Sequence, residues 1–263
     1  MRLQDKVIIV TGSTTGIGKA IALKCVEEGA KVVIHGLEED LGREVFATIR
    51  AKNAVLHIED ITAAGAAQKL VDVAIQHFGK LDAVVNNAAW VVSSDIATTD
   101  PDFLRKVLEV NTVAPFALIR SSLPQLKKTR GSILNIGSVN AWSGEPNLLA
   151  YSISKGALTT LTRNLGDSLF RESGIRVNQI NPGWVLTEKE IIRKKQQGLA
   201  EDWYKELPAV FAPAGRLLAP AEIASAAAFL LSEECGPVSG QVMDIEQYPM
   251  IGRNPPKDFG DNA

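Results

Sequence analysis

The chain has 263 residues, of which 46% are hydrophobic and 22% charged, a composition that suits one large globular α/β domain with a substantial core. Its net charge of −2, with acidic and basic residues interspersed, argues against a nucleic-acid-binding protein. The longest apolar runs are far shorter than the roughly 20 residues that a membrane-spanning helix needs. We therefore expect a protein that binds neither nucleic acid nor membrane.

The cysteines and histidines indicate the compartment and argue against a metal site. Cys25 and Cys235 are far apart in sequence, so we expect no disulfide framework and a reducing compartment. The first residues run directly into a strand pattern and not into a signal peptide, which also favours a cytoplasmic protein. His35, His57 and His77 do not show the spacing of metal ligands, and we expect no metal.

Seven short apolar runs along the chain predict β-strands. They are apolar almost throughout, the pattern of strands that are covered on both faces in a parallel sheet. In chain order the runs are KVIIV, KVVIH, AVLHI, DAVVN, SILNI, RVNQI and QVMDI.

Helical patterns separate these strand candidates. We expect helices at 16–28, 39–51, 62–77, 101–126, 151–172 and 220–232. This alternation predicts an α/β fold with right-handed crossovers: a doubly wound (Rossmann) sheet of about seven parallel strands with helices on both faces, in one domain over 1–263. The stretch 184–219 falls outside the alternation and is a candidate substrate loop or lid, and the tail 253–263 is expected to be extended.

A glycine-rich turn joins the first strand to the first helix in VIIVTGSTTGIGKAIA. Gly12, Gly16 and Gly18 would let the pyrophosphate of a nucleotide approach backbone N–H groups at the helix N-terminus. The spacing is TGxxxGxG and not the GxGxxG dinucleotide fingerprint. A strand-to-helix turn used only for packing is the alternative.

The stretch YSISK places a phenol and an ammonium group four residues apart. Residues at i and i+4 share one face of a helix, so Tyr151 and Lys155 can point at the same small volume. Taken alone, such a pair is common on helix surfaces.

The chain resembles the short-chain dehydrogenase/reductase family. The motifs that carry the resemblance are TGSTTGIG, NNAAW, Asn111, Ser138, YSISK and NPGWVLT, in this order over nearly the whole length. The resemblance implies a nicotinamide dinucleotide at the C-terminal edge of the sheet and hydride transfer between a secondary alcohol and a carbonyl. It also implies a homotetramer, assembled partly through the helices that carry Asn111 and Tyr151.

Within this resemblance Tyr151 is the catalytic acid or base. A phenol with a pKa of about 10 is a poor base at neutral pH. A positive charge at about 4 Å in an effective dielectric of about 20 favours the phenolate by about 4 kcal/mol, or about 3 pKa units before the opposing effect of desolvation. We therefore expect Lys155 to lower the pKa of Tyr151, and the resemblance implies that it also holds the nicotinamide ribose.

Ser138 and Asn111 complete the catalytic set that the resemblance implies. The Ser138 hydroxyl, at the end of a strand, can stabilise developing alkoxide on the substrate oxygen, although a serine there is also an ordinary turn residue. Asn111 matches an asparagine that supports a proton relay past the lysine. A local kink or a bond from its side chain to the backbone is the alternative.

The resemblance also implies a set of cofactor contacts. They are Gly12, Thr14, Thr15, Gly16, Ile17, Gly18, Gly36, Leu37, Asp60, Ile61, Asn87, Ala88, Ala89, Tyr151, Lys155, Pro182, Gly183, Val185 and Thr187. Ala89 departs from the family, which commonly has glycine there, and alanine is disfavoured if the position needs a positive φ. Asp60 can contact adenine, or it can cap the helix expected to begin near Thr62.

The choice between NAD and NADP stays open. An acid at the end of the second strand would accept bonds from the ribose 2′-OH, and a nearby arginine would accommodate a 2′-phosphate. The chain has Gly36 and Leu37 at these positions. Glu38, Glu39 and Asp40 follow, and would repel a phosphate if they faced it.

Aromatic and short polar residues are expected around the substrate. The candidates are Trp90, Asn140, Trp142, Glu145 and Trp184. This mixture suits a sugar or polyol, with rings against C–H faces and polar groups on hydroxyls, but an ordinary amphipathic rim around a 3-oxoacyl substrate or a hydrophobic ketone has the same composition. After the last strand, MDIEQYP replaces the glycine-rich turn that is common in the family.

Two other functions remain open. One is a dinucleotide-binding sensor or scaffold that uses the fold without turnover. The other is an epimerase that uses hydride transfer only transiently. The intact set of Ser138, Tyr151, Lys155 and Asn111 favours the NAD(P)-dependent dehydrogenase, whose partner is a small-molecule alcohol or carbonyl.

Overall fold

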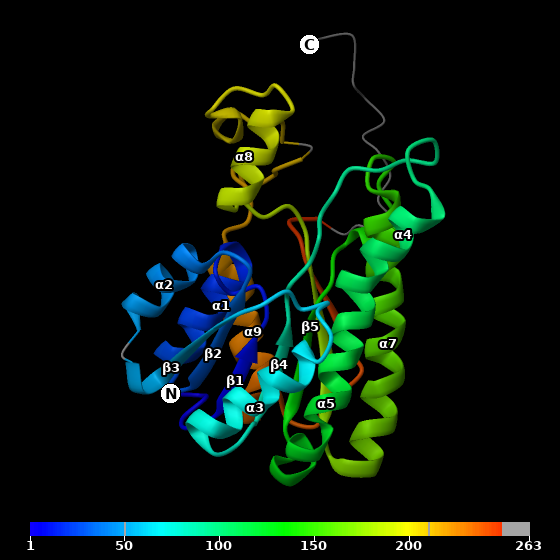
Figure 1. Cartoon of the computed structure of the whole chain (residues 1–263). Helices are drawn as coiled ribbons and strands as arrows, with labels where there is room; N and C mark the ends of the chain where they lie inside the picture. Colours follow the sequence, from blue (N-terminus) through cyan, green and yellow to red (C-terminus); the bar gives the residue numbers. More distant parts are fainter. Residues whose placement is uncertain (50, 210, 249–263) are drawn as a thin grey trace.

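The computed structural model describes residues 1–49, 51–209 and 211–248, so the predicted tail 253–263 lies outside the described residues. The seven predicted runs form one parallel sheet in the order β3-β2-β1-β4-β5-β6-β7. The strands are β1 (Val7–Val10), β2 (Lys31–Gly36), β3 (Ala54–Ile58), β4 (Ala83–Asn86), β5 (Ser132–Ile136), β6 (Arg176–Pro182) and β7 (Val242–Ile245). The predicted α/β fold class is confirmed, and Figure 1 shows helices on both sides of the sheet.

The helices follow the predicted alternation, with additions in the second half of the chain. The α-helices are α1 (Gly16–Glu27), α2 (Glu39–Thr48), α3 (Ala66–Phe78), α4 (Pro101–Leu108), α5 (Ala114–Thr129), α6 (Asn140–Ser143), α7 (Leu149–Ser173), α8 (Glu188–Gln196) and α9 (Pro220–Leu231). Four short turns of other helix types are η1 (Ala51–Asn53), the π-helical η2 (Glu109–Val113), η3 (Trp203–Lys205) and η4 (Glu233–Cys235). The stretch 184–219 thus contains α8 and η3.

Two predicted helices differ in detail from the observed ones. The helix expected from 62 begins at Ala66, because Asp60 accepts hydrogen bonds from the backbone N and the hydroxyl of Thr62 in a turn that precedes it. The single helix expected over 101–126 is divided into α4 and α5 by the π-helical turn η2. Such turns are frequent at functional sites.

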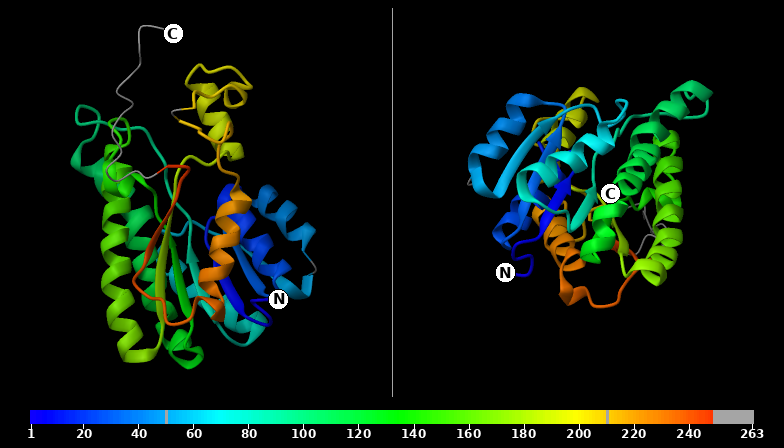
Figure 2. Two further views of the ribbon diagram at one scale, coloured as in Figure 1. Left: turned by 180° about the vertical axis from the view of Figure 1, so that it is seen from behind. Right: turned by 60° about the horizontal axis from the view of Figure 1, so that its bottom comes forward.

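Strand β1 lies at the centre of the fold and is buried on both faces. Ile8 and Val10 belong to a core with α1, α2 and α9, whereas Val7 and Ile9 belong to a second core with α3, α5 and α7. Successive residues of a strand point to opposite faces of the sheet, so this short strand serves both layers. Figure 2 shows α9 and α1 on the face opposite α5 and α7.

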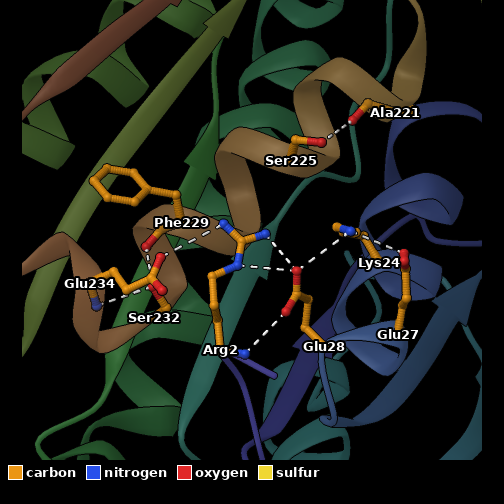
Figure 3. A network of polar contacts seen from close by, with 9 residues as sticks. All are labelled: Arg2, Lys24, Glu27, Glu28, Ala221, Ser225, Phe229, Ser232 and Glu234. Atoms are coloured by element: carbon orange, nitrogen blue, oxygen red, sulfur yellow. Dashed lines mark hydrogen bonds and ion pairs between the residues drawn. The ribbon is translucent and has the colours of Figure 1, made fainter.

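An ionic cluster joins three segments at the amino ends of the strands (Figure 3). The backbone N and the guanidinium of Arg2 donate to the Glu28 carboxylate at 2.6–3.1 Å. Lys24 Nζ is 3.5 Å from the same carboxylate, and Glu234 lies 4.0 Å from the Arg2 guanidinium. The cluster therefore connects the segment before β1 to the end of α1 and to η4. It lies at the edge of the sheet opposite the carboxyl ends of the strands.

His35, on β2, is hydrogen-bonded to two residues of the glycine-rich turn. Its backbone N donates to Ser13 Oγ, its carbonyl accepts from Ser13 N, and its Nδ1 accepts from Gly12 N at 3.4 Å. The ring is 2% exposed, and its Nε2 has no hydrogen-bond partner among the described residues. Burial, helped by the charge of nearby His57, lowers the pKa of His35 to about 4. The imidazole is therefore neutral at physiological pH.

The pKa of His35 predicts a loss of stability in mild acid. An unfolded histidine binds a proton near pH 6.5 and the folded one only near pH 4, so between these values the unfolded state binds more protons and the free energy of unfolding falls as pH decreases. The difference corresponds to about 3 kcal/mol. Urea denaturation at pH 7 to 4.5 should therefore show a shallower pH dependence for His35→Asn, which keeps an acceptor near Gly12 N. The exposed His77→Asn is the control, and equal slopes in the wild type and His35→Asn would contradict the prediction.

Candidate active site

A cleft of about 1190 Å³ opens along the carboxyl edge of the sheet. The chain leaves β1 and β4 toward opposite sides at this edge, because the strand order reverses between them. In open α/β sheets, ligands bind at this type of reversal. The cleft is lined by the turns after β1, β2, β4, β5 and β6 and by α8, which lies beyond the strand ends (Figure 1). All the cofactor residues expected from the sequence line it.

The glycine-rich turn is packed too closely for larger residues. Gly12 has a φ of +62°, and a Cβ there would lie 2.8 Å from Ala88 Cα. A Cβ at Gly18 would lie 2.2 Å from the Gly12 carbonyl oxygen. The Asn87 amide donates to the carbonyls of Thr11 and Gly12, which fixes the turn after β4 against this loop. The result is a backbone cradle at the N-terminus of α1 that fits a pyrophosphate.

Alanine at position 89 is accommodated without strain. Among the described non-glycine residues, positive φ values occur only at Asp5 and Arg130. Thr11 Oγ1 accepts hydrogen bonds from the backbone N of Asn87 and of Ala88, both at 3.0 Å, and these bonds hold the turn. Ala89 therefore does not have a positive φ, and alanine is not disfavoured at this position.

Ser138, Tyr151 and Lys155 meet on the floor of the cleft. Ser138 follows β5, and its side chain is hydrogen-bonded to that of Tyr151 on α7. Lys155, one turn later on α7, donates to the Ile136 carbonyl at 2.7 Å and lies 5.5 Å from the centre of the Tyr151 ring. Each of the three residues is at most 9% exposed. The predicted i,i+4 pair thus faces the cleft and not bulk solvent.

Burial controls the protonation of this pair. It raises the pKa of Tyr151 to about 12, although the bond with Ser138 and the charge of Arg193 act in the opposite direction. It lowers the pKa of Lys155 to about 7. The pKa of Tyr151 is therefore raised and not lowered as expected, because burial has the largest effect on it. Lys155 gives its shortest hydrogen bond to a carbonyl and not to the phenol.

Asn111 lies in the middle of η2 and is fully buried. Its Oδ1 accepts from Trp90 N at 2.7 Å, while its Nδ2 donates to the Trp90 carbonyl and to Ser154 Oγ. The side chain thus joins the segment after β4 to α7 beneath the cleft. This contact is the side-chain-to-backbone alternative that the sequence left open, and the proton relay stays a prediction.

A chain of buried amides supports the serine, and the sequence analysis missed it. Asn135 donates to Thr162 Oγ1, which donates to Gln179 Oε1. Gln179 Nε2 donates to Asn181 Oδ1 at 2.7 Å, and the same oxygen accepts from Ser138 N at 3.1 Å. The signal was present in the amides of SILNI and RVNQINP, polar residues inside otherwise apolar strands. Such residues must be paired when buried, so they fix the backbone that carries Ser138.

Trp142 is not at the predicted substrate position. Its Nε1 donates to Asp244 at 2.9 Å, and the Arg163 guanidinium lies 4.9 Å from the ring centre. Both contacts are on the α7 and β7 side of the short helix α6, while Asn140, two residues earlier, lines the cleft. Residues two apart on a helix point in different directions, so Trp142 lies away from the cleft lining and its role at the substrate stays a prediction.

The other predicted substrate residues line the same cleft as Tyr151. Asn140 donates to Glu145 at 3.2 Å. Trp184 stacks on Trp203 with ring centres 5.3 Å apart, and its Nε1 donates to Glu190 of α8. Trp90 also lines this end. This part of the cleft therefore combines indole faces with hydrogen-bonding groups.

Glu246 is a further cleft residue that the sequence analysis did not assign. Its carboxylate accepts from Trp184 N at 3.2 Å, and a Cβ at Gly183 would lie 1.8 Å from Oε2. Gly183 thus makes room for a carboxylate at the substrate end. The available signal was the EQ pair that follows the last strand in place of a glycine-rich turn.

Neither a metal cluster nor a membrane helix is present in the described part of the chain. Over residues 1–49, 51–209 and 211–248, no three histidine, cysteine or acidic side chains are grouped to hold a metal ion. No helix in the same ranges is both long and apolar enough to cross a bilayer.

Comparison with known proteins identifies the family. The family model described as Enoyl-(Acyl carrier protein) reductase matches residues 12–247. L-fucose dehydrogenase of Mus musculus is 37% identical over 88% of this chain and 84% of its own length. Glucose 1-dehydrogenase 2 of Bacillus subtilis is 33% identical over 93% and 94%, and the NADP-dependent (R)-specific alcohol dehydrogenase of Lentilactobacillus kefiri is 37% identical over 71% and 75%. The cleft geometry and these similarities together show that the chain belongs to the short-chain dehydrogenase/reductase family of NAD(P)-dependent oxidoreductases.

Proposed function

We propose that this protein interconverts a secondary alcohol and a carbonyl on a sugar or polyol, with Tyr151 as the acid or base. The observation that carries the proposal is the convergence of Ser138, Tyr151 and Lys155 on the floor of a cleft that also holds the glycine cradle. A pure binding module has no chemical need for a buried phenol beside a buried amine. The alternative of a sensor without turnover is therefore disfavoured.

Different groups of cleft residues would bind different parts of the dinucleotide. A bound nicotinamide dinucleotide would supply or accept the hydride. The cradle of Gly12, Gly16 and Gly18 would bind its pyrophosphate, and Asp60 with Ile61 would border the adenine. Pro182, Gly183, Val185 and Thr187, which border the cleft beside Tyr151, would hold the nicotinamide.

The proton moves at the Tyr151 hydroxyl. With a pKa of about 12 the phenol is protonated at neutral pH, so it can give its proton to a carbonyl oxygen that becomes an alcohol. Ser138 can donate a hydrogen bond to the same substrate oxygen as negative charge develops there. In the opposite direction Tyr151 must act as a phenolate, which its hydrogen bond with Ser138 and the charge of Arg193 favour.

Two observations support a sugar or polyol. The names of two relatives, L-fucose dehydrogenase and Glucose 1-dehydrogenase 2, describe action on sugars. The substrate end carries Asn140, Glu145 and Glu246 as partners for hydroxyl groups, and indole faces for the C–H surfaces of a ring. The family description and the relative named as an alcohol dehydrogenase make a 3-oxoacyl ester and a simple ketone the comparison substrates.

Tyr151→Phe should separate binding from chemistry. Loss of the acid or base should lower kcat about 10²- to 10⁴-fold, while the affinity for NADH or NADPH stays close to that of the wild type. The measurement is steady-state turnover on a panel of sugars, polyols, 3-oxoacyl esters and ketones, with dinucleotide titrations on the same samples. Tyr204→Phe, on η3, is the matched control and should keep its activity.

The outcomes of this panel distinguish the candidate functions. Near-normal turnover in Tyr151→Phe would remove Tyr151 as the acid or base. Turnover by the wild type only on 3-oxoacyl esters would overturn the sugar assignment. Formation of an isomer without net change in the cofactor would indicate an epimerase, and dinucleotide binding without any turnover would indicate a sensor.

Lys155→Met should stabilise the protein while removing activity. The folded pKa of about 7 lies below the unfolded value of about 10.5, so the unfolded state binds more protons between these values and stability rises with pH from 7 toward 10.5. Below pH 7 the buried charge destabilises the fold, and methionine removes it. Urea denaturation should show a higher midpoint for Lys155→Met at pH 6.5 and a flatter pH profile above pH 7. A lower midpoint at pH 6.5 would contradict the prediction.

Exposed apolar side chains on η2, α5 and α7 support a homotetramer. Val113 and Phe116 are 44% and 46% exposed, and Ile153 on α7 is 43% exposed. Light scattering should give four times the chain mass of 28.3 kDa. Phe116→Glu should produce a smaller species because it places a charge in an apolar contact. Ile96→Glu, also at an exposed position, is the control, and a monomeric wild type would overturn the assignment.

A further inference from the structure

The Glu246 carboxylate lies in the cleft where the chain leaves β6. Its Oε2 accepts from Trp184 N at 3.2 Å, and its Oε1 accepts from Gln247 N at 2.7 Å. A Cβ at Gly183 would overlap this carboxylate, so the side chain fills the space beside the glycine. Glu246 belongs to the turn after β7, where the family commonly has glycines. The negative charge is therefore a feature of this chain that the fold does not require.

The turn that carries Glu246 is fixed on both sides. Before it, the Ile245 carbonyl accepts from Gly183 N at 2.8 Å. After it, the side chain of Gln247 makes two hydrogen bonds with the backbone of 214–216, at 2.9 and 2.7 Å. These bonds join the ends of β6 and β7 to the segment before α9, so the carboxylate is held at one place in the cleft.

The positive charges of this part of the cleft do not neutralise Glu246. In the described ranges of the chain, no cation forms an ion pair with it. Burial lowers the pKa of Lys155 to about 7, so its amine is mostly neutral at pH 8. The cations of α8 that line the cleft each have another partner: Lys189 has Glu38, Arg193 has Glu190, and Lys194 has the Trp184 ring.

We propose that Glu246 makes the cleft select the oxidised form of its dinucleotide over the reduced form. The inference rests on the proposed function, in which Gly183 borders the nicotinamide. An oxidised nicotinamide ring carries one positive charge, and the ring becomes neutral when it accepts a hydride. A carboxylate beside Gly183 attracts the charged ring and not the neutral one, whereas the pyrophosphate, riboses and adenine are the same in both forms.

The geometry of Glu246 favours this attraction. Its two bonds to backbone N–H groups are made inside the protein, so little side-chain freedom is lost when a ligand binds. The residue is only partly exposed, and solvent therefore screens its charge less than on an open surface. A carboxylate also has about four acceptor positions, so the two backbone bonds do not use all of them.

Titration calorimetry with oxidised and reduced dinucleotides tests the inference without any substrate. NAD⁺, NADH, NADP⁺ and NADPH are titrated at pH 8 into the wild type, Glu246→Gln and Glu246→Gly, of which the last installs the residue common in the family. In both variants the affinity for the oxidised form should fall about tenfold, because one unpaired charge is lost. The affinity for the reduced form should stay within about twofold of the wild type, because the reduced ring is neutral.

Glu188→Gln is the matched control. Glu188 is an exposed carboxylate at the start of α8 and does not line the cleft. Its substitution changes the net charge of the protein by the same amount, and it should leave the ratio of oxidised to reduced affinity unchanged. An equal change in Glu188→Gln and Glu246→Gln would indicate a general effect of net charge and would overturn the inference.

The dependence on ionic strength provides a second measurement. Between about 0.05 and about 0.5 M salt, screening should lower the ratio of oxidised to reduced affinity in the wild type. The ratio should change less in Glu246→Gln, because the charge that is screened is absent. The same salt dependence of this ratio in both proteins would contradict the assignment to Glu246.

The remaining outcomes separate this inference from the proposed function. Equal weakening of both forms in Glu246→Gln would make Glu246 a structural residue of its turn and overturn the inference. An unchanged ratio in this variant would also overturn it, while the proposed function would stand. If the wild type bound none of the dinucleotides, the proposed function would fail and this inference with it.

Discussion

Burial of Tyr151 and Lys155 together is the constraint on which the chemistry proposed for this protein depends. Desolvation moves the two pKa values toward their neutral forms, to about 12 and about 7, so the floor of the cleft holds a phenol and an amine that titrates near physiological pH. A surface pair at the same spacing would keep ordinary pKa values. The cost of this arrangement is a buried, titratable lysine whose shortest bond is to the Ile136 carbonyl, and the fold must offset that cost elsewhere.

The chain of buried amides stabilises the backbone that carries Ser138. Asn135, Gln179 and Asn181 lie in strands that are otherwise apolar, and their bonds to Thr162 and to Ser138 N are made inside the protein. A half-paired amide in this position would be destabilising, so the network tolerates few alternative arrangements. It therefore fixes the backbone of Ser138, which lies in the turn after β5, through side chains of β5 and β6.

Regular patterns made much of the molecule predictable from its sequence. Continuous apolar runs predicted the seven strands, and the ordered motifs placed Gly12, Tyr151 and their neighbours along one cleft. The sequence was less informative where the orientation of a side chain, its burial or a contact between distant segments decides which residues line the cleft. Trp142 was grouped with the aromatic and polar residues expected around the substrate, and its indole on α6 is bonded to Asp244, which the sequence did not predict. For Tyr151 the sequence estimate left the opposing desolvation without a magnitude, and burial decides the direction of its pKa shift. Glu246 reaches the cleft from the segment after β7, more than sixty residues after Gly183.

The helix α8 shows how weak contacts can be useful at such a site. In α8, all of whose residues are described, no side chain is buried, so its position depends on polar bonds at its ends and along one face. Partly exposed ion pairs of this kind contribute about 0 to 1 kcal/mol each. Such contacts hold α8 less firmly than the buried face that includes Tyr151 and Lys155 holds α7. The helix with the larger buried face therefore carries Tyr151 and Lys155, and the lightly held one lines the same cleft.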